Sequence, residues 1–123
     1  MVARPLISVV DDDESVRESL PDLLRELGFD AQAFASAEEF LRSDYLGQTG
    51  CLILDIAMPG MTGPDLQNEL KRRGETLPII FITAHGDEST RPQMIESGAV
   101  ECLLKPFSEA SLLGALTTAF RKN

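Results

Sequence analysis

The sequence predicts a doubly wound α/β domain in which helices cover both faces of a five-stranded parallel sheet. Two observations lead to this prediction. Short apolar runs alternate with helical patterns along the chain, which is typical of parallel strands joined by right-handed helical crossovers. Most of the runs are continuous rather than alternating, as expected for strands buried on both faces of a sheet. With 123 residues the chain has the length of one domain, and we expect residues 1–123 to form it.

Five apolar runs are the predicted strands. Four are continuous, and three of these are rich in Ile or Val, which favour strands. The remaining run, Phe29–Phe34, mixes small, polar and aromatic residues, so we expect it at an edge of the sheet. The continuous runs are Leu6–Val10, Cys51–Leu54, Leu77–Ile82 and Cys102–Leu104.

Five helices are predicted after the strands, from apolar residues at helical spacing. Capping serines, a first-turn proline and glycine stops mark their ends. The predicted helices are Val16 to Leu27, stopped by Gly28; the segment with Phe40 and Leu41, capped by Ser36; the segment with Leu66 and Leu70, after Pro64; Glu88–Ser97, stopped by Gly98; and Leu112 to Phe120, capped by Ser108.

The chain is acidic, with 20 Asp and Glu against 11 Lys and Arg and a formal net charge of −9. This balance argues against binding of nucleic acid or a membrane surface by this domain, because phosphates and anionic lipids attract basic proteins. No apolar run approaches the roughly 18 residues of a membrane span. The start MVARPLISVV shows no secretory cleavage site. We therefore expect a cytoplasmic domain with reduced thiols.

Polar side chains stand where four of the predicted strands end. Asp11 and Asp12 follow the first strand, and Asp55 follows the run Cys51–Leu54. Thr83 and Lys105 follow the last two strands. Because ligands of open α/β sheets bind beyond the carboxyl ends of the strands, we expect these five side chains to meet at one edge.

This set of side chains indicates phosphoryl chemistry. Crowded carboxylates repel one another, and a divalent cation removes that cost; oxygen ligands together with waters favour Mg²⁺. A carboxylate beside Mg²⁺ can attack a phosphoryl group, while the metal and a lysine offset the charge in transit. The first turn, DDDESV, lacks the glycine-rich motif that cradles nucleotide phosphates.

The sequence resembles the receiver domain of two-component response regulators, the CheY-like family. Four segments carry the resemblance, namely VVDDDESVR, LDIAMPGMTG, FITAHGD and the Lys-Pro-Phe of LLKPF, and it covers essentially the whole chain. The segments VVDDDE, AHGD and GAVECLLKPF are similar to FixJ/LuxR-type regulators, whose members often carry a DNA-binding domain after the receiver. The resemblance implies a flavodoxin-like sheet of strand order 2-1-3-4-5.

The resemblance also implies a role for each residue at the sheet edge. A sensor histidine kinase would phosphorylate Asp55, and the domain would then switch a partner or output surface, in transcriptional regulation. The peptide between Lys105 and Pro106 is expected to be cis, as is usual in the family. The implied Mg²⁺ ligands are Asp12 directly, Asp11 through water, Asp55 and the backbone carbonyl of Ala57; Thr83 matches the phosphate-sensing hydroxyl and Lys105 the phosphate-pairing lysine.

Two positions depart from the family pattern. The family usually has Tyr or Phe three residues before the lysine, where this chain has Cys102, so the usual coupling of threonine and aromatic cannot operate here. Pro92 lies in the fourth helix, which usually moves on activation. Pro92, like Pro21 in the first helix, removes a backbone donor and should kink or delay its helix.

Other reactive residues receive structural interpretations. His85 is expected at the mouth of the site, where it would affect attack by water, and Asp13 and Glu14 are expected to cap the first helix. Cys51 and Cys102 would lie two strands apart, about 9–10 Å, beyond the roughly 7 Å that a disulfide spans. We therefore predict two free, buried thiols.

Two other functions are alternatives to the phosphorylation switch. A Mg²⁺-dependent phosphatase of the haloacid-dehalogenase kind would use Asp11 and Asp13, but Glu14 and Ser15 stand where Gly-Thr should follow, and a substrate cap has no room. A binding module with a decayed site would lack one of the five site residues. The favoured interpretation is a phosphoacceptor that is not a turnover enzyme. The resemblance further implies that phosphorylation promotes a homodimer through the face formed by the fourth helix, the fifth strand and the fifth helix.

Overall fold

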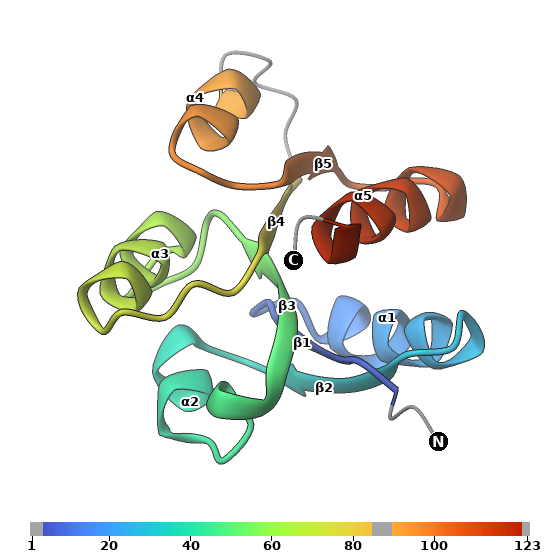
Figure 1. The fold of residues 1–123 in the computed structure, drawn as a ribbon, viewed down its shortest axis with the longest axis horizontal. Helices are drawn as coiled ribbons and strands as arrows, with labels where there is room; N and C mark the ends of the chain where they lie inside the picture. The colour runs from blue at the N-terminus through green and yellow to red at the C-terminus, as the bar shows by residue number, and fades with distance from the viewer. Residues whose placement is uncertain (1–3, 85–89, 122–123) are drawn as a thin grey trace.

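The computed structural model describes residues 4–84 and 90–121, which form alternating strands and helices around one sheet (Figure 1). The strands all run parallel, as predicted. In chain order the elements are β1 (Leu6–Val10), α1 (Glu14–Glu26), β2 (Asp30–Phe34), α2 (Ala37–Arg42), the short 3₁₀ helix η1 (Leu46–Gln48), β3 (Thr49–Asp55), α3 (Gly63–Arg72), β4 (Ile79–Thr83), α4 (Thr90–Glu96), β5 (Glu101–Leu104) and α5 (Glu109–Arg121).

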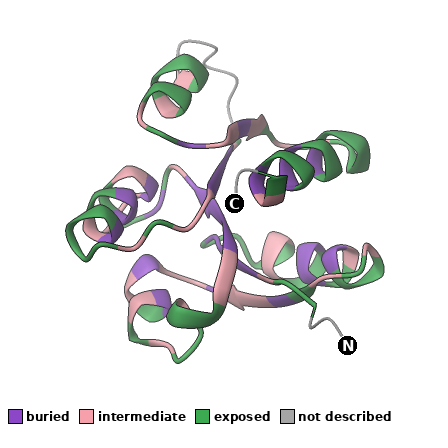
Figure 2. Ribbon diagram, in the orientation of Figure 1, coloured by how far each residue is buried: buried purple, intermediate pink, exposed green. Residues whose placement is uncertain are grey.

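The strand order in the sheet is β2-β1-β3-β4-β5, which confirms the order that the family resemblance implied. The central strands β1, β3 and β4 are almost fully buried (Figure 2), as their continuous apolar sequences predict. β2 lies at the edge of the sheet, as its mixed composition predicts. The carboxyl ends of β1, β3 and β4 therefore lie side by side.

α1 and α5 cover one face of the sheet, and α2, α3 and α4 lie on the other (Figure 1). α1 and α5 pack their leucines, such as Leu24 and Leu116, against Ile53 and its neighbours. On the opposite face, Phe40 of α2 and Leu66 of α3 pack against Leu54. This burial of apolar area on both faces is the main stabilising contribution to the fold.

The two cysteines lie on opposite faces of the sheet. Cys51 belongs to the core under α1 and α5, and Cys102 belongs to the core on the other face. Both thiols are free and buried, which confirms the prediction. Burial raises the pKa of the Cys51 thiol to about 12, so this residue is a packing group rather than a nucleophile.

The helix boundaries follow local sequence signals. Asp13 and Ser36 accept hydrogen bonds from the first turns of α1 and α2, and Gly28, at φ 100°, follows the end of α1 in a conformation that favours glycine. α1 starts at Glu14, well before Pro21, so that proline does not delay the helix.

Pro92 is the third residue of α4. The predicted start of this helix at Glu88 lies outside the described residues.

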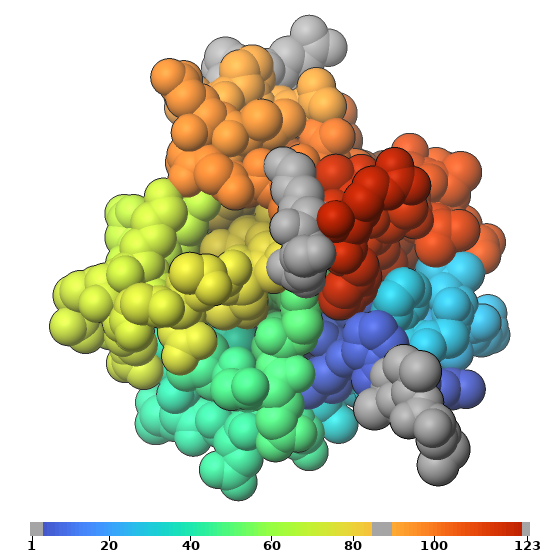
Figure 3. Space-filling model, in the orientation of Figure 1, coloured from blue at the N-terminus to red at the C-terminus, as the bar shows by residue number. Residues whose placement is uncertain are grey.

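The end of α5 packs against the amino-terminal part of β3. In the space-filling view of Figure 3, the red end of α5 lies beside the green start of β3. Phe120 stacks on Phe29 at a centroid distance of 5.7 Å, and a side-chain atom at position 50 would come within 3.1 Å of the Phe120 ring, so Gly50 makes room for it. Within the described ranges, no helix is both long enough and apolar enough to cross a membrane.

Candidate functional site

Three carboxylates meet at the carboxyl ends of β1 and β3. One oxygen from each of Asp11, Asp12 and Asp55 lies within 4.8 Å of the others. Asp11 is fully buried and Asp55 is 5% exposed, whereas Asp12 is exposed. Asp55 is the last residue of β3, so the buried strand itself holds its backbone. The structure thus brings together the acids that the sequence places at this edge.

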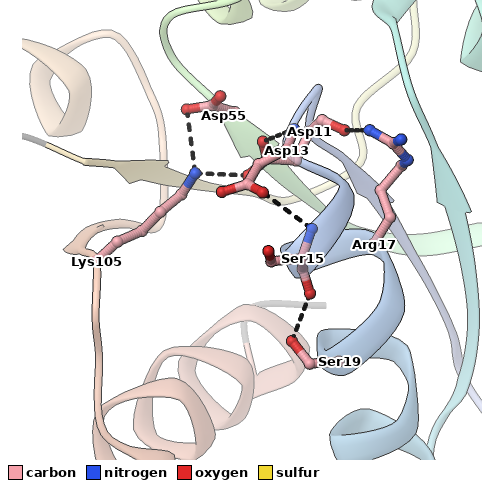
Figure 4. A network of polar contacts seen from close by, with 7 residues as sticks. All are labelled: Asp11, Asp13, Ser15, Arg17, Ser19, Asp55 and Lys105. Carbon is pink, nitrogen blue, oxygen red and sulfur yellow. Dashed lines mark hydrogen bonds and ion pairs between the residues drawn. The ribbon is translucent and has the colours of Figure 1, made fainter.

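Each polar group of Asp11 has a defined neighbour, and Figure 4 shows those that Asp13, Arg17 and Lys105 contribute. Its amide donates to the carbonyl of Phe34 at 3.1 Å, and its Oδ1 accepts from the amide of Asp13 at 2.8 Å. Its carbonyl accepts from the Arg17 guanidinium at 3.0 Å, and its Oδ2 lies 2.7 Å from Lys105 Nζ. Asp11 is therefore the most constrained of the three acids.

Lys105 reaches into the site from the segment after β5. Its Nζ lies 2.7 Å from Asp11 Oδ2 and 3.9 Å from Asp55 Oδ1, and its side chain is 16% exposed. Its backbone amide donates to the carbonyl of Thr83 at 2.8 Å. The resemblance implies that Lys105 pairs with phosphate; in this structure its closest carboxylate is that of Asp11.

The surroundings of Asp55 disfavour its ionised form. Burial raises the pKa of Asp55, and the negative charge of Asp11 raises it further; Lys105 opposes these effects, and the result is about 7. Three carboxylates share one ammonium group among the described residues of this cluster. The site therefore has a deficit of positive charge.

This deficit fits a small hard cation. Asp11 Oδ2 is buried and has no hydrogen bond of regular geometry, although the Lys105 ammonium lies beside it. Asp12 and Asp55 supply two further carboxylates within ligand distance of a shared ion. Carboxylate oxygens, with one acid open to water, are the donor set that Mg²⁺ prefers.

The loop after β3 is shaped by a close approach at Gly63. A Cβ at position 63 would collide with the backbone carbonyl of Asp55, so only glycine allows α3 to start here. The amide of Gly63 donates to the carbonyl of Ile56 at 3.0 Å, and a capping box of Thr62 and Asp65 starts the helix. The return of α3 therefore helps to fix Asp55.

The remaining predicted site residues are placed as follows. Thr83 is the last residue of β4 and is half-buried, and Ala57 is exposed in the loop after β3. Cys102 is 5% exposed on β5, and its amide donates to Glu101 Oε1 at 3.0 Å. The Lys105–Pro106 peptide is cis, as predicted. His85 lies outside the described residues.

Asp13 and Glu14 are capping residues, as predicted. Asp13 is the N-cap of α1, where its Oδ1 accepts from the amide of Ser15 at 2.9 Å, and Glu14 is the acid of the first turn. Met58 is part of the core and Met94 packs against it.

Two contributors were missed from the sequence, Arg17 and Gly63. Arg17 lies four residues after Asp13, one helical turn into α1, so helix spacing alone could have directed attention to it. No sequence signal shows that Gly63 touches the backbone of Asp55.

Comparisons with known proteins give one consistent result. The family model described as "Response regulator receiver domain" matches residues 7–117. The response regulator protein TodT of Pseudomonas putida is 45% identical over 116 residues, which cover 94% of this chain and 51% of TodT. The transcriptional regulatory protein FixJ of Azorhizobium caulinodans is 35% identical over 117 residues, which cover 95% of this chain and 56% of FixJ. The solved structure of the response regulator StyR, 46% identical, superposes with a TM-score of 0.88 over 98% of this chain and 61% of StyR. The chain spans about half the length of the curated relatives it matches.

Proposed function

The chain belongs to the response regulator receiver domain family of two-component signalling, and we propose that Asp55 is its phosphoacceptor. The observation that carries the proposal is the convergence of Asp11, Asp12 and Asp55 with Lys105 at one sheet edge. We further propose that residues 1–123 form one receiver domain, which the single five-stranded sheet supports.

The proposed reaction moves a phosphoryl group from a phosphohistidine of a sensor kinase to Asp55. A carboxylate oxygen of Asp55 forms a bond to phosphorus while the phosphorus–nitrogen bond breaks, and the electron pair of that bond stays on the imidazole nitrogen. Asp55 must be ionised to attack. Burial and the charge of Asp11 raise the pKa of Asp55, so both disfavour this ionised form.

We propose that Asp11, Asp12, Asp55 and the carbonyl of Ala57 hold Mg²⁺. When bound, the ion offsets the charge of the carboxylates and of the phosphoryl oxygens. The exposed Asp12 is suited to direct contact with the ion, and the buried Asp11 to contact through water. Lys105 already lies within 3.9 Å of Asp55, so a modest movement would bring its ammonium onto a phosphoryl oxygen.

Thr83 is proposed to respond to the phosphoryl group. Thr83 ends β4, and its carbonyl accepts from the Lys105 amide, so the two residues are linked through the backbone. A hydrogen bond from the Thr83 hydroxyl to a phosphoryl oxygen would shift the populations of the neighbouring loops and of α4. Cys102 cannot supply the aromatic side chain that usually accompanies this movement, so the output must proceed without it.

We propose that the domain is a switch and not a turnover enzyme. The acyl phosphate would be lost slowly when water bonds to phosphorus and the Asp55 oxygen leaves as a carboxylate, with release of inorganic phosphate. Membership of the receiver family argues against the haloacid-dehalogenase alternative. All five predicted site residues are present, which argues against a decayed module. The proposed location is the cytoplasm.

An apolar groove beside the site is the proposed docking surface for the kinase. Val16, Leu20 and Leu23 of α1 line it on one side, and Pro106 and Phe107 on the other. Lys105 also lines this groove, of about 630 Å³, so a helix docked there would bring its histidine toward Asp55. We propose that the sensor kinase presents an amphipathic helix to this groove.

A second surface is proposed for output. Ile95 on α4, Leu104 on β5 and Leu113 on α5 are large apolar side chains that are 38–46% exposed. We propose that phosphorylation promotes a homodimer through this face and that the output is transcriptional, as the name of FixJ indicates for that relative. Light scattering with and without beryllofluoride and Mg²⁺ tests this proposal: the mass should double with the mimic, and an unchanged mass would contradict it.

Labelling with acetyl phosphate and Mg²⁺ tests the proposed acceptor. The wild-type chain should gain the mass of one phosphoryl group, and Asp55→Asn should gain none. Asp22→Asn, an exposed acid of α1, is the matched control and should be labelled like the wild type. Undiminished labelling of Asp55→Asn would refute Asp55 as the acceptor.

A further inference from the structure

We infer that Arg17 is a positioning residue for the metal site, acting through the backbone of Asp11. The inference rests on the proposed function, because it concerns how the proposed Mg²⁺ site is held in shape. Arg17 touches neither Asp12 nor Asp55 by any hydrogen bond or ion pair found in the described ranges. Its guanidinium donates to the carbonyl of Asp11 at 3.0 Å, from the first turns of α1 (Figure 4).

The contact closes a small ring between β1 and α1. The Arg17 amide donates to the carbonyl of Asp13 at 3.2 Å, and the Asp13 amide donates to Asp11 Oδ1 at 2.8 Å. The Arg17 side chain then returns to the Asp11 carbonyl. The turn that carries Asp11 and Asp12 is therefore hydrogen-bonded to α1 at both its ends. Arg17 is the donor in both bonds, through its side chain to Asp11 and through its amide to Asp13.

Such a tie is needed because the carboxylates push one another apart. Asp11 and Asp12 face Asp55 within 4.8 Å, and Lys105 is the cation that contacts Asp11 and Asp55. A turn free to relax would increase the separation of the carboxylates and so lower the affinity for a small cation. Site geometry that is fixed before binding removes this cost from the binding step.

A purely electrostatic role for Arg17 predicts the opposite effect. A positive charge close to a cation site weakens binding of the cation, so its removal would tighten Mg²⁺ binding if charge were all that mattered. Loss of a positioning contact weakens binding instead. The sign of the change in affinity therefore separates the two roles.

The chain offers a matched control in Arg25. This residue lies on the same helix, is also partly exposed, and donates to a backbone carbonyl as well, that of Ala31 at 2.8 Å. It differs from Arg17 in holding β2 rather than the acidic turn. Arg25→Met thus removes the same charge and the same kind of backbone contact, together with an exposed ion pair to Asp22, at a position away from the site.

The test is a calorimetric Mg²⁺ titration of wild type, Arg17→Met and Arg25→Met. We expect Mg²⁺ to bind 5- to 10-fold more weakly to Arg17→Met and within twofold of wild type to Arg25→Met. In labelling with acetyl phosphate, the half-saturating Mg²⁺ concentration of Arg17→Met should rise by the same factor, while the rate at saturating Mg²⁺ stays within twofold. A merely less stable protein would lose amplitude without this shift.

Unchanged or tighter Mg²⁺ binding by Arg17→Met would overturn the inference, as would an equal loss in Arg25→Met. If Arg17→Met does not fold, Arg17→Gln removes the same charge and is subject to the same sign criterion. Failure of the proposed function has a different signature, since the wild type itself would then neither bind Mg²⁺ nor accept a phosphoryl group.

Discussion

Two clusters of charged side chains in this molecule have opposite electrostatic character. On α3, Glu69 accepts hydrogen bonds from Arg72 and Arg73 at 2.6–2.9 Å, and these bonds lower the pKa of Glu69 to about 2. At the sheet edge, burial and the charge of Asp11 raise the pKa of Asp55 to about 7. One carboxylate has two cations beside it, whereas three carboxylates share Lys105 in the described part of the other cluster.

The difference distinguishes charges that are neutralised within the protein from charges that a ligand would neutralise. The Glu69 cluster lies at the surface, where the side chains of Arg72 and Arg73 are exposed, and its three ions are brought together by helix spacing. The Asp55 cluster is drawn from three strand ends and buries charge without enough compensation. Such uncompensated groups persist at sites where a ligand supplies the missing charge.

The largest expected effect comes from removing the ammonium of the site. Lys105→Met leaves the fully buried Asp11 without its ion pair, and we expect the metal-free protein to lose about 2–4 kcal/mol of stability at pH 8. Urea denaturation followed by circular dichroism measures this loss. Lys71→Met, which removes a lysine that donates to the Ser97 carbonyl and contacts no carboxylate in the described residues, is the control. An equal loss in both variants would show that the two clusters do not differ as described.

The second effect is the pH dependence of stability. Because the pKa of Asp55 is higher in the folded chain than in the unfolded one, the folded state binds the proton more tightly. Stability contributed by protonated Asp55 is therefore present at low pH and is lost as pH rises from about 4 to about 7. Asp55→Asn should be about 1–3 kcal/mol more stable than wild type at pH 8 without metal, and equal to it near pH 4.

Mg²⁺ should remove most of this difference at pH 8. An ion that binds only the folded chain stabilises the wild type by about 2.7 kcal/mol at one hundred times its dissociation constant. Asp55→Asn lacks one of the proposed ligands and should gain less. Thermal unfolding with increasing Mg²⁺ measures both responses, and equal gains in the two proteins would argue against Asp55 as a ligand.

The smallest effect is expected in the exposed cluster. Glu69→Gln removes two surface ion pairs, which contribute little in water, so the denaturation midpoint should change by an amount close to experimental error. Added salt should leave this result unchanged. A loss as large as that of Lys105→Met would contradict the distinction between the two clusters.

The sequence alone predicted where the strands lie and which acidic residues stand at their carboxyl ends. Continuous apolar runs and polar residues just after them reflect burial on two faces, and these patterns are local. The order β2-β1-β3-β4-β5 came from the family resemblance, because periodicity does not say which strands are neighbours. The ends of β3 and β4 fall one residue later than predicted, so Asp55 and Thr83 are the final residues of their strands.

Contacts between residues far apart in sequence could not be predicted from local sequence patterns. The approach of Gly63 to the Asp55 carbonyl depends on the return of α3, and the pairing of Lys105 with Asp11 depends on how two distant strand ends meet. The 3₁₀ helix Leu46–Gln48 also has no clear sequence signal. These features depend on packing between elements far apart in sequence.

The most direct test of the account is an NMR titration of the Asp55 side-chain carboxyl carbon, with and without Mg²⁺. We expect the pKa of Asp55 to be near 7 without metal. With Mg²⁺ bound, we expect it to fall well below the ordinary aspartate pKa of about 4. Glu69, followed in the same spectra, should have a pKa below its ordinary range in both conditions and should not respond to Mg²⁺. If the Asp55 carboxyl titrates near 4 and does not respond to Mg²⁺, the central claim is wrong: the carboxylates of this site would not need a bound cation to compensate their charge.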